Sequence, residues 1–151
     1  MTDSGLQLPA AQGGVVRRKP MLLLEQDALL RRTVMLTARN LGMTDIHEAA
    51  SQGVAARMLR ERPFHGVLIA LDFGDRRYDQ VDLTMIDRIR DGGTASAADI
   101  PIAVLLGYCD ALLLRELHQR QVLRVILKPF RARALLETLS EMQSVRSVPV
   151  A

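Results

Sequence analysis

Blocks of apolar and polar residues follow one another along this chain in a pattern that predicts strands and helices in turn. The clearest block is the unbroken apolar run Val67–Leu71, with Gly66 before it and Asp72 after it. A short continuous run bounded in this way is typical of a strand buried on both faces, as in the middle of a parallel sheet. Apolar runs predict further strands at 21–24, 101–106 and 125–127, and a more polar segment predicts an edge strand at 44–49.

Apolar residues at helical spacing predict a helix after each of these strands. Asp27 and Ser51 stand where N-caps are expected for the first two helices, and Gly42 stands where the first should end. The other helices are expected at about 80–90, 110–121 and 130–142. Strands that alternate with helices indicate a parallel sheet covered on both faces, and right-handed crossovers favour an α/β doubly wound, flavodoxin-like sandwich with strand order 2-1-3-4-5.

The length of 151 residues is that of one domain. Residues 1–20 are expected to form a flexible N-terminal tail, 21–143 the domain, and 144–151 a C-terminal tail with no output domain. No apolar run is long enough to span a bilayer, and the first twenty residues lack the order of a secretory signal, so a cytoplasmic protein without a membrane partner is expected. The single cysteine, Cys109, excludes an internal disulfide.

The positive charge of the chain does not indicate nucleic-acid binding. The formal charge of +3 comes from 18 arginines and 2 lysines against 17 acids, and the basic residues are interspersed with the acids. The chain has two Tyr, three Phe and no Trp, whereas a nucleic-acid surface calls for a concentrated basic face with aromatic side chains. A mixed, solvated surface is the simpler interpretation.

Several polar residues stand at the ends of the predicted strands, where open α/β sheets hold their sites. The strands deliver Glu25 and Gln26, then Ala70–Asp72, Leu106 and Lys128. In order and spacing this set resembles the receiver domains of two-component response regulators, the CheY-like family. Glu25 and Ala70 stand 45 positions apart, Leu106 and Lys128 stand 22 apart, and the family's Lys-Pro segment is matched by VILKPF. The resemblance covers about residues 21–142.

The resemblance implies a signalling role in a phosphorelay and also exposes losses. The family has an Asp that accepts the phosphoryl group where this chain has Ala70, and an acidic pair for Mg²⁺ where Gln26 carries no charge. The family's hydroxyl residue is here Leu106, and its moving aromatic is Val125. Of the family's pocket residues, Lys128 is unchanged. We therefore expect a degenerate pocket with no catalytic residue.

Three residues of this pocket leave alternatives open. A Mg²⁺ ion held by Glu25 and Asp72 would bind weakly, because this ion requires closely positioned carboxylates, and no other cofactor is expected. Asp72 is also an alternative phosphoryl acceptor, although it lies about 6.5 Å beyond the family's position along a strand. Lys128 is expected to pair with Glu25 or Asp72, because an unpaired, partly buried ammonium is costly. The resemblance also implies a cis peptide bond between Lys128 and Pro129.

The segment 110–121 carries more leucines than one core-facing stripe needs. In the family this helix, the strand after it and the last helix form the face that changes its packing. An exposed apolar strip rimmed by arginines is typical of a protein-binding surface, although the leucines also suit the core. A protein partner, or a second copy in a homodimer, is expected to contact Leu113, Leu114, Arg115, Arg120, Arg124 and Arg131.

The leading hypothesis is a stand-alone pseudo-receiver that acts by phosphorylation-independent protein–protein interaction. One alternative is a receiver phosphorylated at Asp72. Another is a sensor in which Arg76 and Arg77, or the arginines near 110–121, bind an anionic nucleotide. An enzyme is not indicated, because the sequence has no nucleophile–base pair or cofactor motif. Cys109 at a helix start is consistent either with a lowered thiol pKa or with simple packing.

Overall fold

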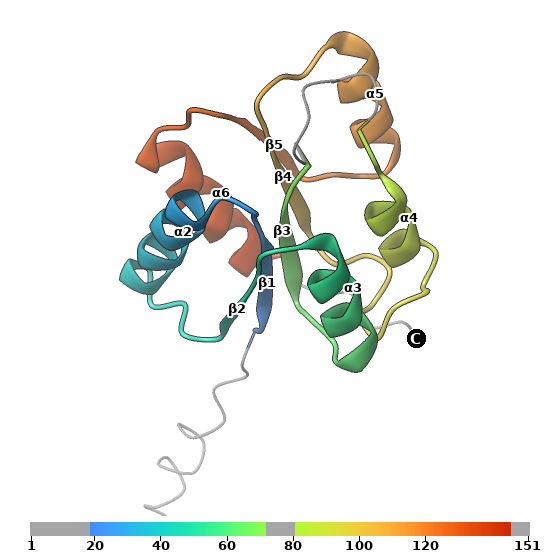
Figure 1. Ribbon diagram of the computed structural model, residues 1–151, viewed down its shortest axis with the longest axis horizontal. Helices are drawn as coiled ribbons and strands as arrows, with labels where there is room; N and C mark the ends of the chain where they lie inside the picture. Colours follow the sequence, from blue (N-terminus) through green and yellow to red (C-terminus); the bar gives the residue numbers. More distant parts are fainter. Residues whose placement is uncertain (1–18, 72–80, 146–151) are drawn as a thin grey trace, which may run out of the picture.

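The computed structural model describes residues 19–71 and 81–145, which form a parallel sheet between two layers of helices (Figure 1). The 5-stranded sheet has the order β2-β1-β3-β4-β5, which confirms the predicted fold class and strand order. In the described part of the chain no helix is both long and apolar enough to cross a bilayer. The elements are β1 (Met21–Leu24), α2 (Ala28–Asn40), β2 (Ile46–Ala49), α3 (Gln52–Glu61), β3 (Gly66–Ala70), α4 (Thr84–Arg90), β4 (Ile102–Leu106), α5 (Ala111–Gln119), β5 (Arg124–Leu127) and α6 (Ala132–Ser144).

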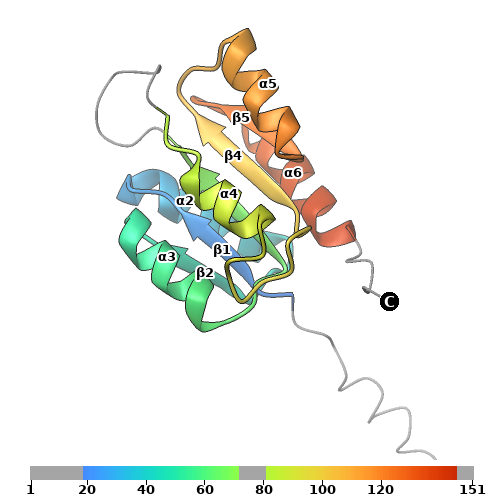
Figure 2. The same cartoon turned by 90° about the vertical axis from the view of Figure 1, so that its right-hand side faces the viewer.

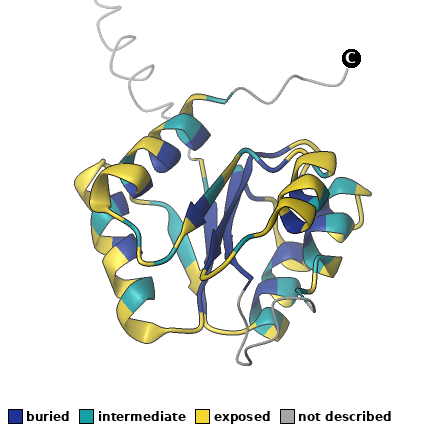
Figure 3. Cartoon of the chain, turned by 90° about the horizontal axis from the view of Figure 1, so that it is seen from above, coloured by how far each residue is buried: buried dark blue, intermediate teal, exposed yellow. Residues whose placement is uncertain are grey.

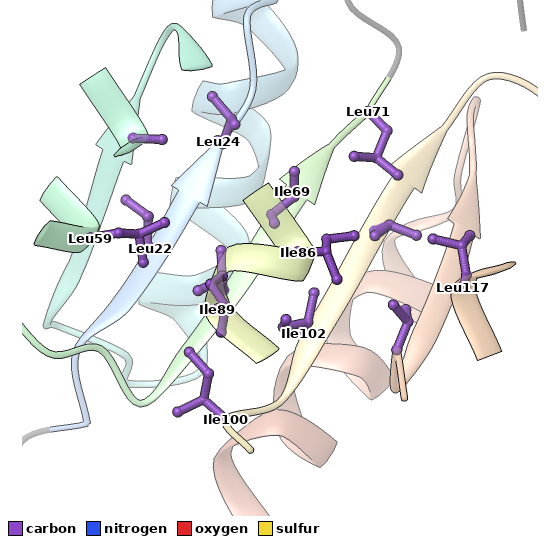
Figure 4. Packing of buried hydrophobic residues seen from close by; sticks show 14 of the residues in the cluster. Leu22, Leu24, Leu59, Ile69, Leu71, Ile86, Ile89, Ile100, Ile102 and Leu117 are labelled. Atoms are coloured by element: carbon purple, nitrogen blue, oxygen red, sulfur yellow. The ribbon is translucent and has the colours of Figure 1, made fainter. Parts of the chain in front are cut away.

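Two apolar clusters cover the two faces of the sheet. Helices α2 and α6 pack on one face, and α3, α4 and α5 pack on the other (Figures 1 and 4). Successive residues of a strand point to opposite faces, so Leu68 and Ala70 of β3 join the α2–α6 cluster while Val67 and Ile69 join the other. Figure 3 shows the strands buried between helices whose outer sides are exposed. The unbroken apolar run of β3 is therefore explained by burial on both sides.

The predicted helix boundaries hold where a cap fixes them. Asp27 Oδ1 accepts the Leu29 N–H at 2.9 Å, and Ser51 Oγ accepts the Val54 N–H at 3.2 Å. Gly42 follows α2 with φ of 79°, a left-handed conformation that favours glycine at this position. These three predictions are confirmed.

Helix α4 begins later than its apolar spacing suggests. It starts at Thr84, because the Asp82 carboxylate accepts the Thr84 N–H at 2.9 Å in a local turn that precedes the helix. The same hydrogen bonds lower the pKa of Asp82. Residues 72–80, including Asp72, Arg76 and Arg77, lie outside the described residues, as do most of the two predicted tails.

Gly66 serves close packing rather than a turn. It is the first residue of β3, and a Cβ there would lie 3.0 Å from Met21 Sδ and 3.2 Å from the Pro101 carbonyl oxygen. A Cβ here would push against the Met21 side chain and the Pro101 backbone, so glycine lets β3 begin this close to its neighbours.

Two arginines join α4 to α5. Arg120 forms an ion pair with Asp87 of α4 at 2.6 Å and another with Glu116 of α5 at 2.8 Å, and these acids raise the pKa of Arg120. Arg90, at the end of α4, donates to the carbonyl oxygens of Arg120 at 2.8 Å and Ile100 at 2.7 Å. Burial lowers the pKa of the Arg90 guanidinium. Both side chains hold α4 against the turn that leads from α5 into β5.

The last turn of α6 lies beside side chains from the start of the described chain and from the loop before β3. Lys19 Nζ donates to the Gln143 carbonyl oxygen at 2.6 Å. The imidazole of His65 lies near the backbone of Met142 and Val145, but its buried Nε2 has no hydrogen-bond partner among the described residues. The Lys19 ammonium satisfies a carbonyl group that has no partner within the helix. The C-terminal end of α6 thus lies beside the amino end of the sheet.

We predict that acid destabilises the protein through His65. Burial and the neighbouring Lys19 ammonium lower the pKa of His65 below its ordinary value of 6.5. Because the unfolded chain then binds a proton more readily than the folded chain, stability is lost as the pH falls through about 6.5 toward the folded-state pKa. Urea unfolding from pH 7.5 to 5 should show a smaller loss in His65→Gln than in wild type. His118→Gln, on exposed α5 surface, is the matched imidazole control, and an equal loss in all three proteins contradicts the assignment to His65.

Candidate functional site

The candidate site lies at the carboxyl edge of the sheet, where the strand ends bring distant residues together. Glu25 follows β1 and Lys128 follows β5, while Ala70 and Leu106 are the last residues of β3 and β4. Glu25, Gln26 and Lys128 line a shallow hollow of about 440 Å³ together with Asp27 and Leu30.

Glu25 is a carboxylate buried at the edge of the sheet, with 3% of its surface exposed. Its N–H donates to the Ala49 carbonyl oxygen at 3.1 Å, which extends the pairing of β1 with β2 by one residue. Arg31 donates to the Glu25 carbonyl oxygen at 2.9 Å and pairs with Glu48 at 2.9 Å. Hydrogen bonds to the N–H and to the C=O of Glu25 therefore fix its backbone, and with it the direction of its side chain. No sequence pattern singles out Arg31, because its role depends on contacts between elements.

Lys128 neutralises this carboxylate. Its Nζ lies 2.7 Å from Glu25 Oε1, with side-chain exposures of 15% and 4% for the two residues. Oε1 is buried and forms no well-aligned hydrogen bond, so the contact is an ion pair, while Oε2 accepts the Asp27 N–H at 3.1 Å. The Lys128 N–H donates to the Leu106 carbonyl oxygen at 2.7 Å, and the bond to Pro129 is cis, as the resemblance implies. Of the two partners predicted for Lys128, Glu25 is found, and Asp72 lies outside the described residues.

The side chains of Ala70 and Leu106 are buried in the core on opposite faces of the sheet. Ala70 is 2% exposed and packs in the α2–α6 cluster. Leu106 is 1% exposed and packs on the opposite face of the sheet. Neither side chain has an oxygen, so neither can accept a phosphoryl group or hydrogen-bond to one. Val125 is half-buried against the cluster that contains Leu106.

Those residues of this site that the structure describes, which do not include Asp72, fit a Mg²⁺ ion poorly. Glu25 already contacts an ammonium through one oxygen and a backbone N–H through the other. The Asp27 carboxylate caps α2, and Gln26 is exposed and uncharged. Mg²⁺ prefers charged oxygen ligands in octahedral geometry, which this set does not supply. Within residues 19–71 and 81–145 no group of three or more His, Cys, Asp or Glu is placed to hold a metal ion.

The predicted partner-binding residues are divided between surface and core. Leu113 was expected on the surface, but it is 9% exposed and packs with the core, because α5 turns this position and Leu117 toward the sheet. Leu112 takes its place on the surface with 64% exposure, and Leu114 is 38% exposed. Four consecutive apolar residues do not reveal which of them point inward.

The arginines of this face differ in their engagement. Arg115 and Arg131 are exposed, Arg120 is tied to Asp87 and Glu116, and Arg124 pairs with Glu141 of α6 at 2.8 Å. Sequence patterns missed Leu127, which is 52% exposed at the outer edge of β5. The predicted strand order was a usable signal, because it already placed this strand at the edge of the sheet.

Cys109 does not have the lowered pKa that its position before a helix allows. Burial, and secondarily the Asp110 carboxylate, raise the pKa of its thiol. Asp110 caps α5 by accepting the Leu113 N–H at 2.8 Å, which places a negative charge beside the sulfur. Cys109 is therefore interpreted as a packing residue.

Comparison with known proteins supports the fold. No family model matches the sequence, and no curated protein matches it. A response regulator from Thermotoga maritima has 24% identity and a TM-score of 0.68, over 84% of this chain and 99% of that one. A signal receiver domain of a two-component histidine kinase from Clostridium thermocellum has 15% identity and a TM-score of 0.71, over 84% and 98%. The chemotaxis protein CheY4 of Vibrio cholerae has 17% identity and a TM-score of 0.67, over 82% and 98%. The chain therefore has the fold of response-regulator receiver domains.

We predict that Glu25 and Lys128 stabilise the fold only as a pair. Lys128→Met should lower the free energy of unfolding by about 3–5 kcal/mol, because it leaves a buried carboxylate without its cation. The double variant Glu25→Leu/Lys128→Met should recover most of this loss, and urea denaturation measures both. Arg124→Met, which breaks a more exposed ion pair with Glu141, is the control and should cost less than about 1 kcal/mol. Equal costs for Lys128→Met and Arg124→Met would show that the pair is not effectively buried.

Proposed function

We propose that this chain is a degenerate receiver that regulates by binding a protein partner, without phosphoryl transfer. The observation that carries the proposal is the buried ion pair between Glu25 and Lys128 beside a sealed Ala70. The two charged groups that serve the metal ion and the phosphoryl group in receivers here neutralise each other. The proposal assigns the chain no reaction and no cofactor.

The surface proposed for the partner is the α5–β5–α6 face. Leu112 and Leu114 on α5 and Leu127 on β5 are exposed, and Arg115 and Arg131 lie on the same elements or next to them. Exposed leucines flanked by arginines suit a protein interface, where apolar contacts supply affinity and arginines supply directed hydrogen bonds. The partner is another protein or a second copy of the chain.

The two alternative functions depend mainly on residues outside the described part of the chain. Asp72, the alternative acceptor, and Arg76 and Arg77, candidates for nucleotide binding, lie outside the described residues. Near α5, Arg120 is already neutralised by two carboxylates. A site for an anionic nucleotide needs several arginines that are not neutralised in this way.

We predict that a small phosphodonor does not modify the protein. Incubation with acetyl phosphate and Mg²⁺ should leave the intact mass unchanged, because position 70 offers no carboxylate and Lys128 is paired with Glu25. A receiver domain with an intact acceptor, treated in parallel, controls for donor activity. A phosphoryl adduct that disappears in Asp72→Asn overturns the proposal and establishes Asp72 as the acceptor.

We predict that Leu112→Glu and Leu114→Glu each weaken partner binding by about tenfold or more while the free energy of unfolding changes by less than about 0.5 kcal/mol. Partners are first captured from a lysate on the wild-type protein and identified by mass spectrometry, and affinity is then measured with the purified partner. Sedimentation of the protein alone reports a second copy as the partner. Leu36→Glu on α2, at 50% exposure, is the matched control on the other side of the sheet. Binding that survives both Leu112→Glu and Leu114→Glu contradicts the assignment of this face.

A further inference from the structure

The outer edge of β5 and the side of α6 enclose a groove of about 470 Å³. Among the strands that the structure describes, β5 is terminal, with β4 on one side and none on the other (Figure 2). The groove is lined by strand residues, by the turn at Pro129 and Phe130, and by one side of α6 from Arg131 to Thr138. An open strand edge presents backbone donors and acceptors to any extended segment that lies along it.

The alternation along β5 fixes which backbone groups face the groove. The Lys128 N–H, just after the strand, donates to the Leu106 carbonyl oxygen of β4 at 2.7 Å. The Leu105 carbonyl oxygen of β4 instead accepts the N–H of Leu71, which follows β3. Alternate residues of a parallel strand bond to the same neighbour, so the N–H and C=O groups of Arg124 and Ile126 point toward β4. Those of Val125 and Leu127 point away from β4, and these two residues therefore provide the hydrogen-bonding positions for an added strand.

The groove carries an excess of positive charge. Arg124, Arg131 and Arg133 line it, with the Glu137 carboxylate among them, and Glu141 beside the groove is paired with Arg124. Arg133 contacts Glu137 at 3.4 Å with 89% of its own side chain exposed, and a pair this exposed contributes little. Arg131 stands at the N-cap of α6 and forms no ion pair with any other described residue. The first turn of α6 contains no acid to offset the positive end of the helix.

The two sides of the strand edge differ in character. Arg124 pairs with Glu141 of α6, and Ile126 packs in the α2–α6 cluster. The side chains of these alternate residues therefore lie on the same face of the sheet as α6 and its arginines. Val125 packs in the opposite cluster, which places the half-exposed Leu127 on the side of α5. A strand added here would meet positive charge with every second side chain and an apolar surface with the others.

We infer that the groove binds an extended, acidic segment of a partner protein, which adds to β5 as a sixth strand with alternating acidic and apolar side chains. This inference rests on the proposed function and names the chemistry of its partner. A second copy is a poor occupant, because two β5 edges placed together would bring the same arginines of both copies into one seam.

The test uses a fluorescein-labelled ten-residue peptide of alternating Val and Glu, with a Val-Lys peptide of the same length as the charge control. Fluorescence anisotropy should show binding of the acidic peptide alone, and the binding should weaken as salt is raised. Arg131→Glu/Arg133→Glu should weaken it about tenfold, whereas Arg39→Glu/Arg32→Glu on α2, with the same change in net charge, should change it less than twofold. N-methylation should abolish binding when it removes the peptide N–H groups that face β5. Methylation of the residues in between, whose N–H groups face away from β5, should leave binding unchanged.

Amide NMR signals locate the peptide and separate the two proposals. The largest shifts should fall on Val125 and Leu127, with slowed hydrogen exchange at their N–H groups. Equal binding of the Val-Lys peptide, shifts centred on α5, or no binding at all overturns the added strand. The proposed function still stands in those cases if Leu112→Glu abolishes partner binding, and it fails separately if Leu112→Glu does not.

Discussion

Burial of the parallel sheet on both faces is the constraint on which the rest of this structure depends. Every residue of β1, β3 and β4 is buried, so these strands contribute no polar side chain until they end. Polar chemistry is therefore restricted to the strand ends, where Glu25 and Lys128 meet, and to the sheet edges at β2 and β5. The two proposals concern these two places, and the same burial explains why: elsewhere the sheet is covered by helices.

The ion pair at the carboxyl edge and the arginine contacts between α4 and α5 both stabilise one packing of the domain. A receiver responds to phosphorylation by shifting between two packings of its α5–β5–α6 face, in the labels used here. Lys128 is held by Glu25, and Arg90 and Arg120 hold α4 to the end of α5. Each contact stabilises the described arrangement. A surface that is kept in one arrangement suits recognition that does not depend on a phosphoryl signal.

Sequence patterns predicted the fold well because burial and capping are largely local signals. The run Val67–Leu71 contains nearly all of β3, and the caps Asp27 and Ser51 were found where predicted. The expected pairing of Lys128 with Glu25 is confirmed. The errors concern tertiary contacts. Four successive apolar residues in α5 do not reveal that Leu113 points inward. The raised pKa of Cys109 depends on burial and on Asp110, which helix position alone does not convey.

The contact between Lys19 and Gln143 has a consequence for how this domain is joined to anything else. Lys19 precedes β1 at the amino end of the sheet, and α6 runs back across the sheet to finish beside it, with 2.6 Å between the Lys19 Nζ and the Gln143 carbonyl oxygen. The backbone thus enters and leaves the domain side by side. A segment attached at either end of the described domain is joined to it at the amino end of the sheet. Glu25 and Lys128 lie at the carboxyl end, away from both points of attachment.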